Sequence, residues 1–225
     1  MAPSEPEMRE AAEAAAALIE PGMRVGLGTG RTVAWLLQAL AARNVGDLRC
    51  VATSPDTERA ATALGIPVEP FDRLARLDVA IDGADQVTDD HWAIKGGHGA
   101  HLREKIVAAA AERFVVIVSR DKLVDALHPP VPLELERFGL AATLSALGQA
   151  ALRPGAPVTP DGGVLADYHG PIEDREALAR RFDQTPGVTG HGLFGPPLIH
   201  DVIVGGDRRA VRSGHEFPCS DPTRE

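Results

Sequence analysis

Short apolar segments of strand length alternate with longer segments of helical periodicity through the first half of the chain. This alternation is typical of right-handed βαβ units, in which helices cover a parallel sheet. It therefore predicts an α/β fold with a Rossmann-like domain. The predicted strands are 24–27, 48–53, 67–69, 77–81 and 113–118, and the predicted helices are 7–20, 32–43, 55–64 and 100–112.

The pattern changes after His128-Pro129-Pro130. In the second half, Pro160-Asp161-Gly162-Gly163 predicts a hairpin turn. The elements around this turn follow the order βαββαβ, which is the ferredoxin-like α+β arrangement. The predicted strands are 133–138, 156–159, 164–169 and 188–194, and the predicted helices are 141–152 and 173–182.

The order of these elements predicts two domains and a tail. Residues 198–204 predict a further strand that returns to the first sheet. We expect residues 1–128 and 198–212 to form the Rossmann-like domain, and residues 129–197 to form the smaller ferredoxin-like domain. Residues 213–225 are polar and contain Pro and Gly, so we expect a loose tail.

Charge and cysteine content exclude several classes of protein. The net charge is −9, which argues against sequence-independent binding of nucleic acid. Cys50 and Cys219 are too few for a disulfide framework or a multi-cysteine zinc site. Glu10, Glu13 and Glu20 exclude a secretory or membrane-spanning segment near the N-terminus. We therefore expect a cytoplasmic protein without a membrane or nucleic-acid partner.

Segment 25–32 reads VGLGTGRT at a predicted strand-to-helix turn. Backbone amides and the helix dipole at such a turn attract phosphate or another anion. Arg31 stands where the dinucleotide fingerprint needs Gly, and the P-loop spacing is also absent. A tight structural turn is the alternative, although Thr29, Arg31 and Thr32 offer groups that suit phosphate.

Charged side chains follow two other predicted strands. Asp82 and Asp85 come after strand 77–81, and Lys122 comes after strand 113–118. In open α/β sheets, ligands bind beyond the carboxyl ends of the strands. The alternatives are a turn or capping motif for the aspartates and an ordinary surface position for Lys122.

A second glycine-rich loop, Lys95-Gly96-Gly97-His98-Gly99, leads into helix 100–112. Its glycines allow close approach of the backbone to a ligand, and Lys95 would add a positive charge there. Glu104 lies about 200° around the helix from Leu102, outside the predicted apolar stripe. The alternative to a functional Glu104 is a solvent-facing side chain favoured by the helix dipole. The predicted stripe is Leu102, Ile106, Ala109 and Ala110.

Together, these groups suit proton abstraction next to a carbonyl, which needs a base, a cation for the developing oxyanion and an acid. His91, His98 and His101 lie close together in the sequence, but HExxH or a similar ligand spacing is absent. We therefore expect no metal site.

At these residues the chain resembles the A-type ribose-5-phosphate isomerase family, from about Met8 to Arg212. The run of motifs in order is far more specific than any single loop. These motifs are VGLGTG at 25–30, IDGAD at 81–85, IKGG at 94–97, LREKIV at 102–107, DKLVD at 121–125, PVTPDGG at 157–163 and PGVTGHGLF at 186–194.

The resemblance implies interconversion of ribose 5-phosphate and ribulose 5-phosphate through an enediolate, without a metal or cofactor. It implies that Glu104 is the base and that Lys95 lies near the reacting oxygens. In one division of roles, Asp82 assists ring opening while Asp85 and Lys95 hold the sugar oxygens and the enediolate. A homodimer or homotetramer is also implied. The implied phosphate or sugar ligands are Gly28, Thr29, Gly30, Arg31, Thr32, Gly96, Gly97 and Lys122.

Several residues depart from the family pattern and leave substrate choice open. One alternative is an isomerase for a related aldose phosphate, and another is a non-catalytic sugar-phosphate sensor on the same fold. A nucleotide-dependent enzyme is disfavoured by the glycine spacing. The departures are Arg31 for Ser, Gln86 for an acid, His98 for Gly, His101 for Leu, and Met8 and Arg9 where the family often has two lysines.

Overall fold

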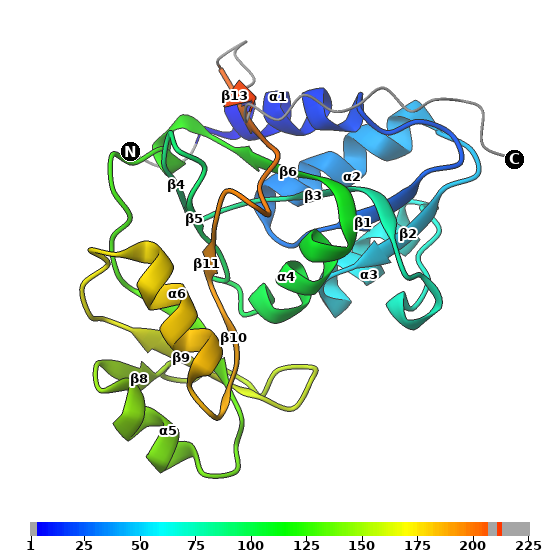
Figure 1. The fold of residues 1–225 in the computed structure, drawn as a ribbon. Coiled ribbons are helices and arrows are strands. Elements are labelled where there is room, and N and C mark those ends of the chain that lie inside the picture. Colours follow the sequence, from blue (N-terminus) through cyan, green and yellow to red (C-terminus); the bar gives the residue numbers. More distant parts are fainter. Residues whose placement is uncertain (1–3, 207–210, 213–225) are drawn as a thin grey trace, which may run out of the picture.

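The larger sheet is mostly parallel and has the strand order β13-β12-β6-β3-β1-β2. Figure 1 shows its strands β6, β3, β1 and β2. The computed structural model describes residues 4–206 and the backbone of 211–212. Strands β2, β1, β3, β6 and β12 pair in parallel, and β13 pairs antiparallel with β12. The predicted returning strand is confirmed as β12. The bounds are β1 Arg24–Leu27, β2 Arg49–Ala52, β3 Leu77–Asp82, β6 Ala111–Val118, β12 Asp201–Val204 and β13 Val211–Arg212.

The two faces of this sheet pack against different helices, because successive residues of a strand point to opposite faces. Val79 and Ile81 of β3 belong to the apolar core beneath α1 and α2, whereas Ala80 belongs to the core beneath α4. Burial on both faces explains why these strands are almost continuously apolar. The helices are α1 Glu5–Ala16, α2 Arg31–Arg43, α3 Pro55–Ala63 and α4 His101–Ala110, with the short 3₁₀ helices η1 Phe71–Arg73 and η2 Arg120–Lys122.

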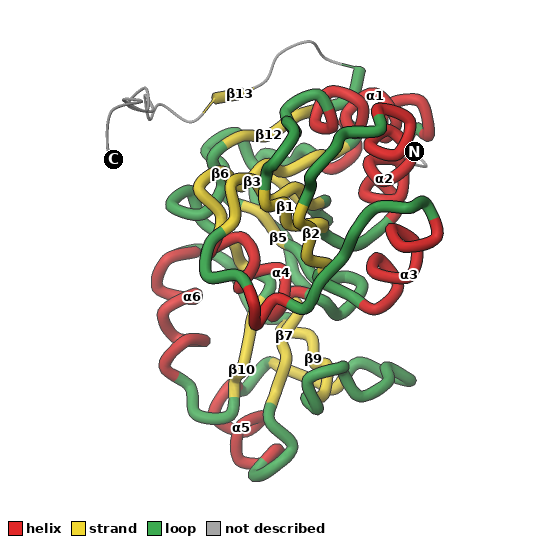
Figure 2. Tube along the Cα trace, turned by 90° about the vertical axis from the view of Figure 1, so that its right-hand side faces the viewer, coloured by secondary structure: helices red, strands yellow, loops and turns green. Residues whose placement is uncertain are grey.

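A second, antiparallel sheet has the strand order β10-β7-β9-β8. Figure 2 shows β10, β7 and β9 of this sheet. With α5 and α6, the sheet follows the chain order βαββαβ, so the predicted ferredoxin-like unit is confirmed. Leu147, Leu178 and Phe182 of the two helices pack into its apolar core. The bounds are β7 Val131–Leu135, α5 Leu140–Leu147, β8 Ala150–Leu152, β9 Val164–Tyr168, α6 Arg175–Gln184 and β10 Val188–His191.

Two predictions in this unit are wrong. Helix 141–152 ends early, at Leu147, because Gly148 adopts a φ of 74° and closes it. The following residues form β8, and the strand predicted at 156–159 is instead part of the loop between β8 and β9. The loop is fixed by turns, since the Thr159 amide donates to the carbonyl of Gly163 at 2.9 Å.

A small sheet between the two larger ones was not predicted. The strand expected at 188–194 divides at Gly192, and its second part, β11 Leu193–Phe194, pairs with a hairpin of two short strands. The order is β11-β5-β4, with β4 Gln86–Val87 and β5 Ala93–Ile94. Strands β5 and β11 of this small sheet lie between the parallel sheet and the ferredoxin-like unit (Figure 1). Lys95 follows β5 directly in the chain.

Other predictions have different outcomes. Segment 67–69 forms only an isolated bridge between Val68 and Cys50, so a strand there is wrong. The expected tail at 213–225 lies outside the described residues. The division into residues 1–128 with 198–212 and residues 129–197 stays a prediction. Among the described residues, every helix is too short or too polar to cross a bilayer.

Gly192 provides a test of the packing that places Lys95. A Cβ at this position would overlap the backbone carbonyl of Lys95 and approach Pro132 to 2.9 Å. We predict that Gly192→Ala lowers the free energy of unfolding by about 1–3 kcal/mol, the usual range for overpacking. Gly46→Ala is the matched control, because the space around Gly46 is open. Equal urea denaturation midpoints for the two variants would contradict this packing.

Candidate active site

A cleft at the carboxyl ends of β1 and β3 gathers most of the predicted residues. The strand order reverses between these neighbours, since β1 leads outward to β2 and β3 leads outward to β6. Ligands of open α/β sheets bind at such a reversal. The cleft has a volume of about 130 Å³ and is lined by Met8, Thr29, Gly30, Arg31, Thr32, Gly83, Ala84, Asp85, Lys95, Gly96, His98, Glu104, Ser119 and Lys122.

The glycine-rich turn between β1 and α2 forms one wall of the cleft. Gly28 has no room for a side chain, because a Cβ would overlap the carboxylate of Asp82. Gly30 caps α2 with a φ of 117°, which side chains disfavour. The first amides of α2 have no acceptor within the helix, and Arg31 adds a cation to its first turn. An anion bound here would be stabilised by both.

Hydroxyl groups of residues that follow β2 form hydrogen bonds with this turn. Thr29 Oγ1 is 2.8 Å from Thr53 Oγ1 and 2.8 Å from Ser54 Oγ. Thr57 donates its hydroxyl to the carbonyl of Gly28 at 2.8 Å. These three supporting residues follow β2 and were not predicted, although their position at or just after the end of the predicted strand 48–53 was a usable signal.

Asp82 ends β3 with both carboxylate oxygens engaged. Its Oδ1 accepts from the amides of Thr29 at 2.9 Å and Gly83 at 2.7 Å. Its Oδ2 lies 2.8 Å from Nζ of Lys95, and the side chain is only 3% exposed. A carboxylate so deeply buried requires a nearby cation, and Lys95 is that cation.

Lys95 lies between two buried carboxylates. Its Nζ is 2.8 Å from Asp82 Oδ2 and 3.2 Å from Glu104 Oε2, and it donates to the carbonyl of Gly83. Burial acts to lower the pKa of Lys95, but Asp82 and Glu104 outweigh it and raise this pKa above its ordinary value. Burial, followed by the charge of Asp82, raises the pKa of Glu104 more than Lys95 lowers it. The ammonium and the strongly basic carboxylate are therefore equipped for proton transfer.

Asp85 and Lys122 also line the cleft. Asp85 Oδ2 accepts from the amide of Gly97 at 2.8 Å, so this amide is already engaged. Lys122 ends η2, and its side chain is 31% exposed, 3.7 Å from Asp121. Of the predicted ligands, Gly28 and Gly97 pack on the carboxylates of Asp82 and Asp85, while the others line the cleft.

The predicted apolar face of α4 is wrong, and so is the solvent-facing alternative for Glu104. Ile106 of that face is 50% exposed, whereas Glu104 is only 4% exposed. Periodicity located the apolar residues, but the partnership with Lys95 decides which face is buried. The buried residues of α4 are His101, Glu104, Val107 and Ala108.

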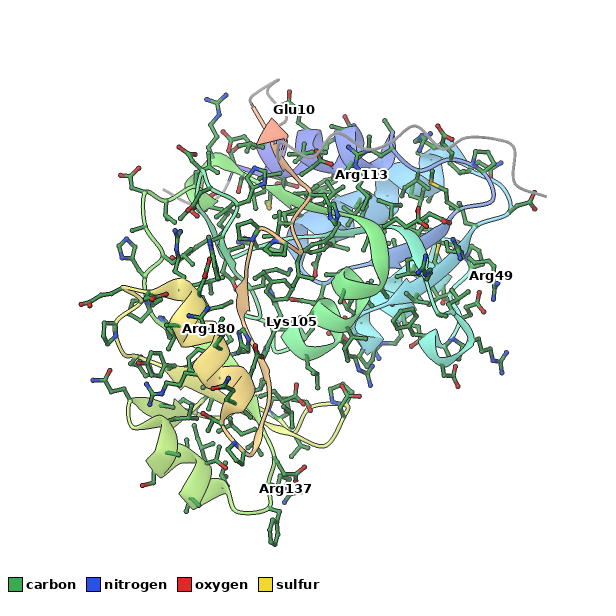
Figure 3. All side chains as sticks on the ribbon, viewed as in Figure 1. Glu10, Arg49, Lys105, Arg113, Arg137 and Arg180 are labelled. Carbon is green, nitrogen blue, oxygen red and sulfur yellow. The ribbon has the colours of Figure 1, made fainter. Side chains whose placement is uncertain are left out.

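Lys105, the next residue of α4, reaches toward β10 and β11 (Figure 3). Its Nζ lies 3.0 Å from His191 Nε2 and donates to the carbonyl of Leu193 at 2.9 Å. Burial lowers the pKa of Lys105 to about 7. Glu104 thus connects α4 to Lys95 at the cleft, and Lys105 connects α4 to His191 of the ferredoxin-like unit.

Five residues that line the cleft were not predicted as site residues: Met8, Gly83, Ala84, His98 and Ser119. Ser119 follows β6, so its strand-end position was a usable signal. Met8 lies on α1 and reaches the cleft only through tertiary packing, which the sequence pattern does not indicate. Within residues 4–206, His, Cys, Asp and Glu side chains form no group of three or more suited to a metal ion.

Comparisons with known proteins agree on one family. The family model for ribose 5-phosphate isomerase A (phosphoriboisomerase A) matches residues 49–209. The chain is 43% identical over 231 residues to ribose-5-phosphate isomerase A of Roseiflexus castenholzii, covering 96% of this chain and 97% of that protein. It is also 43% identical to the protein of the same name from Caulobacter vibrioides, covering 92% and 96% of the two chains.

Solved structures show the same similarity. Ribose 5-phosphate isomerase A from Neisseria gonorrhoeae superposes with a TM-score of 0.85 at 32% identity, covering 90% of this chain and 93% of that one. A D-ribose-5-phosphate isomerase in complex with phospho-erythronic acid superposes with a TM-score of 0.83 at 33% identity, covering 88% and 93%.

Removing the cation tests the electrostatics of the cleft. We predict that Lys95→Met lowers the free energy of unfolding by about 3–5 kcal/mol at neutral pH, because two buried carboxylates lose their partner. The pKa of Glu104 then rises further above its unfolded-state value. Stability tied to a raised pKa is present at low pH and lost as pH increases, so the difference from the unaltered protein shrinks as pH falls. Urea denaturation across a pH series measures it.

The double variant Lys95→Met with Glu104→Gln is the control. Replacing one carboxylate by a neutral amide should recover part of the lost stability at neutral pH. A loss that is independent of pH, or equal in the single and double variants, would show that the buried charges are not its cause.

Proposed function

The chain belongs to the ribose 5-phosphate isomerase A family, and from that premise we propose how its cleft interconverts ribose 5-phosphate and ribulose 5-phosphate. The observation that carries the proposal is the Lys95 ammonium, held 3.2 Å from the Glu104 carboxylate at the cleft wall. The pair lies in the same cleft as the anion-suited N-terminus of α2. The cleft therefore offers the N-terminus of α2 to the phosphate of a sugar phosphate and the Lys95–Glu104 pair to its reacting carbons.

We assign the phosphate to the N-terminus of α2. Free helix amides and a favourable dipole suit an anion there. Thr32 and the cations Arg31 and Lys122 line the same cleft, where their side chains add charge-assisted hydrogen bonds to the phosphate. These local cations overcome the repulsion that a chain of net charge −9 exerts on an anionic substrate.

We assign the proton transfer to Glu104. In the open-chain aldose, its carboxylate removes the proton from C2 and leaves an enediolate. The ammonium of Lys95 stabilises the negative oxygen. Glu104 then returns the proton to C1, while the hydroxyl proton of O2 moves to O1, and the ketose is complete. Burial raises the pKa of Glu104, which makes it a stronger base for an unactivated C–H group.

The two aspartates have different roles in this proposal. Both oxygens of Asp82 are engaged and its side chain is 3% exposed, which supports a role in holding the charge and position of Lys95. Asp85 lines the cleft, which supports ring opening and contact with the sugar hydroxyls. This reverses the division in which Asp82 assists ring opening.

Substrate choice and assembly extend the proposal. His98 lines both the cleft and a neighbouring cavity of about 320 Å³, so it lies where a longer sugar would extend. We propose ribose 5-phosphate as the preferred substrate, and comparing its turnover with that of other aldose phosphates tests this choice. The homodimer or homotetramer stays a prediction, which light scattering of the purified protein decides.

Glu104→Gln tests the base. The amide keeps the shape of the side chain but accepts no proton, so kcat should fall by about 10²–10⁴. Binding of ribose 5-phosphate, measured by calorimetry, should persist. Asp161→Asn is a control on the neighbouring loop, because Asp161 pairs with Arg103 on α4 at 2.7 Å without lining the cleft. An unchanged kcat in Glu104→Gln would remove this residue from proton transfer, and binding without ketose formation by the unaltered protein would indicate a sensor.

Arg31→Ser tests the phosphate site. Loss of a charge-assisted contact should raise KM for ribose 5-phosphate about tenfold, with little change in kcat. The inhibition constant of inorganic phosphate should rise in parallel. Arg9→Ala is the matched control, since Arg9 shares the groove along α1 and α2 with Arg31 but does not line the cleft. An equal effect of both substitutions on KM would contradict a direct phosphate contact.

A further inference from the structure

The loop that carries Lys95 is held by a side chain from the ferredoxin-like unit. Arg153 follows β8, and its Nη1 donates to the carbonyls of Gly97 at 3.0 Å and Gly96 at 3.4 Å. These contacts join residues 56 and 57 positions apart in the chain. Arg153 therefore contacts the backbone of the two residues that directly follow Lys95.

The guanidinium of Arg153 is itself fixed in place. Asp167 of β9 binds it at two points, with Nε–Oδ2 at 2.9 Å and Nη2–Oδ1 at 2.6 Å. The backbone amide of Arg153 donates to the carbonyl of Leu165 at 2.9 Å. A fork held in this bidentate way has a defined direction, which a lysine would not provide.

The loop needs such an external contact. Gly96 and Gly99 adopt φ values of 96° and 78°, and glycine leaves the backbone free to sample many other conformations. On the side facing β3, the Gly97 amide donates to Asp85. On the other side, the Gly97 carbonyl accepts from Arg153. One residue is thus held from opposite directions by groups of the two structural units.

From these contacts we propose that Arg153 is a positioning residue for the isomerase reaction, an inference that rests on the proposed function. By fixing the carbonyls of Gly96 and Gly97, it keeps the Lys95 ammonium at the distance from Glu104 that proton transfer and enediolate stabilisation require. Arg153 does not line the cleft, so it acts through the loop rather than on the sugar. Misplacement of a reacting group by about 1 Å costs about 10²-fold in rate.

A second arginine provides a matched control. Arg175 of α6 binds Asp90, in the β4–β5 hairpin, with Nη1–Oδ1 at 3.0 Å and Nη2–Oδ2 at 2.6 Å. Like Arg153, Arg175 forms a bidentate pair with an aspartate. Arg175 also connects the ferredoxin-like unit to the rest of the chain, because Asp90 lies outside that unit. It differs in making no contact with residues 95–99 among its described hydrogen bonds.

The experiment compares Arg153→Met, Arg153→Lys, Asp167→Asn and Arg175→Met with the unaltered protein. For each, we measure kcat and KM for ribose 5-phosphate, the urea denaturation midpoint, and hydrogen exchange of the Gly97 and Gly99 amides. We expect Arg153→Met to lower kcat by 10-fold to about 10²-fold with KM changed less than about threefold. Exchange at Gly97 and Gly99 should become faster. Arg153→Lys and Asp167→Asn should have smaller effects, and added guanidinium should restore part of the activity of Arg153→Met.

Each outcome decides between positioning and general stabilisation. Arg175→Met should keep kcat and the exchange rates of the Gly97 and Gly99 amides at the level of the unaltered protein. This should hold even if its urea denaturation midpoint falls as much as that of Arg153→Met. An unchanged kcat in Arg153→Met, or an equal loss of kcat in Arg175→Met, overturns the proposal. If Arg153→Met does not fold, the same comparison is made with Asp167→Asn, and an unchanged kcat and unchanged loop exchange there overturn it. If the unaltered protein forms no ribulose 5-phosphate, the proposed function fails, and the exchange rates still decide whether Arg153 holds the loop.

Discussion

One ammonium between two carboxylates, each side chain no more than 4% exposed, is the constraint that organises this protein. Each of these charges alone would cost several kcal/mol to bury, so the three must come together. Asp82 arrives at the end of β3, Lys95 after β5 and Glu104 in the first turn of α4. The small β11-β5-β4 sheet positions Lys95, which follows β5, beside Asp82 and Glu104. Gly28 leaves space for the carboxylate of Asp82, and Gly192 leaves space for the backbone carbonyl of Lys95.

The same constraint produces the chemistry that we propose. Asp82 and Glu104 keep Lys95 charged, so a cation is already in place before negative charge develops on a substrate oxygen. Burial makes Glu104 a stronger base than an exposed glutamate. The phosphate end of the substrate is recognised by different groups at the N-terminus of α2. Binding and proton transfer are therefore assigned to separate walls of one cleft.

The sequence predicts those parts of the fold that rest on long apolar periodicity. The parallel sheet and the βαββαβ order are confirmed, and Asp85 and Lys122, which the strand-end rule singled out, both line the cleft. Strands of two residues, such as β4 and β5, are too short to show a period of two. The end of α5 was missed because the conformation of Gly148, rather than a change in hydrophobicity, closes the helix.

The site shows the same division between local and tertiary information. Spacing alone put Glu104 off the apolar stripe, and only its ion pair with Lys95 explains why the side chain is buried. The contact between Arg153 and the Gly96–Gly97 carbonyls depends on the pairing of β8 with β9, and no local pattern predicts it.

The most direct measurement is a side-chain NMR titration that follows the carboxyl carbon of Glu104 and the Nζ of Lys95. Glu104→Gln and Lys95→Met assign the two signals. We expect the pKa of Glu104 to lie clearly above its ordinary value of 4.5. We also expect Lys95 to keep its proton beyond its ordinary pKa of 10.5, or for as long as the protein stays folded. A Glu104 that titrates at or below 4.5, or a Lys95 that is neutral in the folded protein, would contradict the buried arrangement of charges.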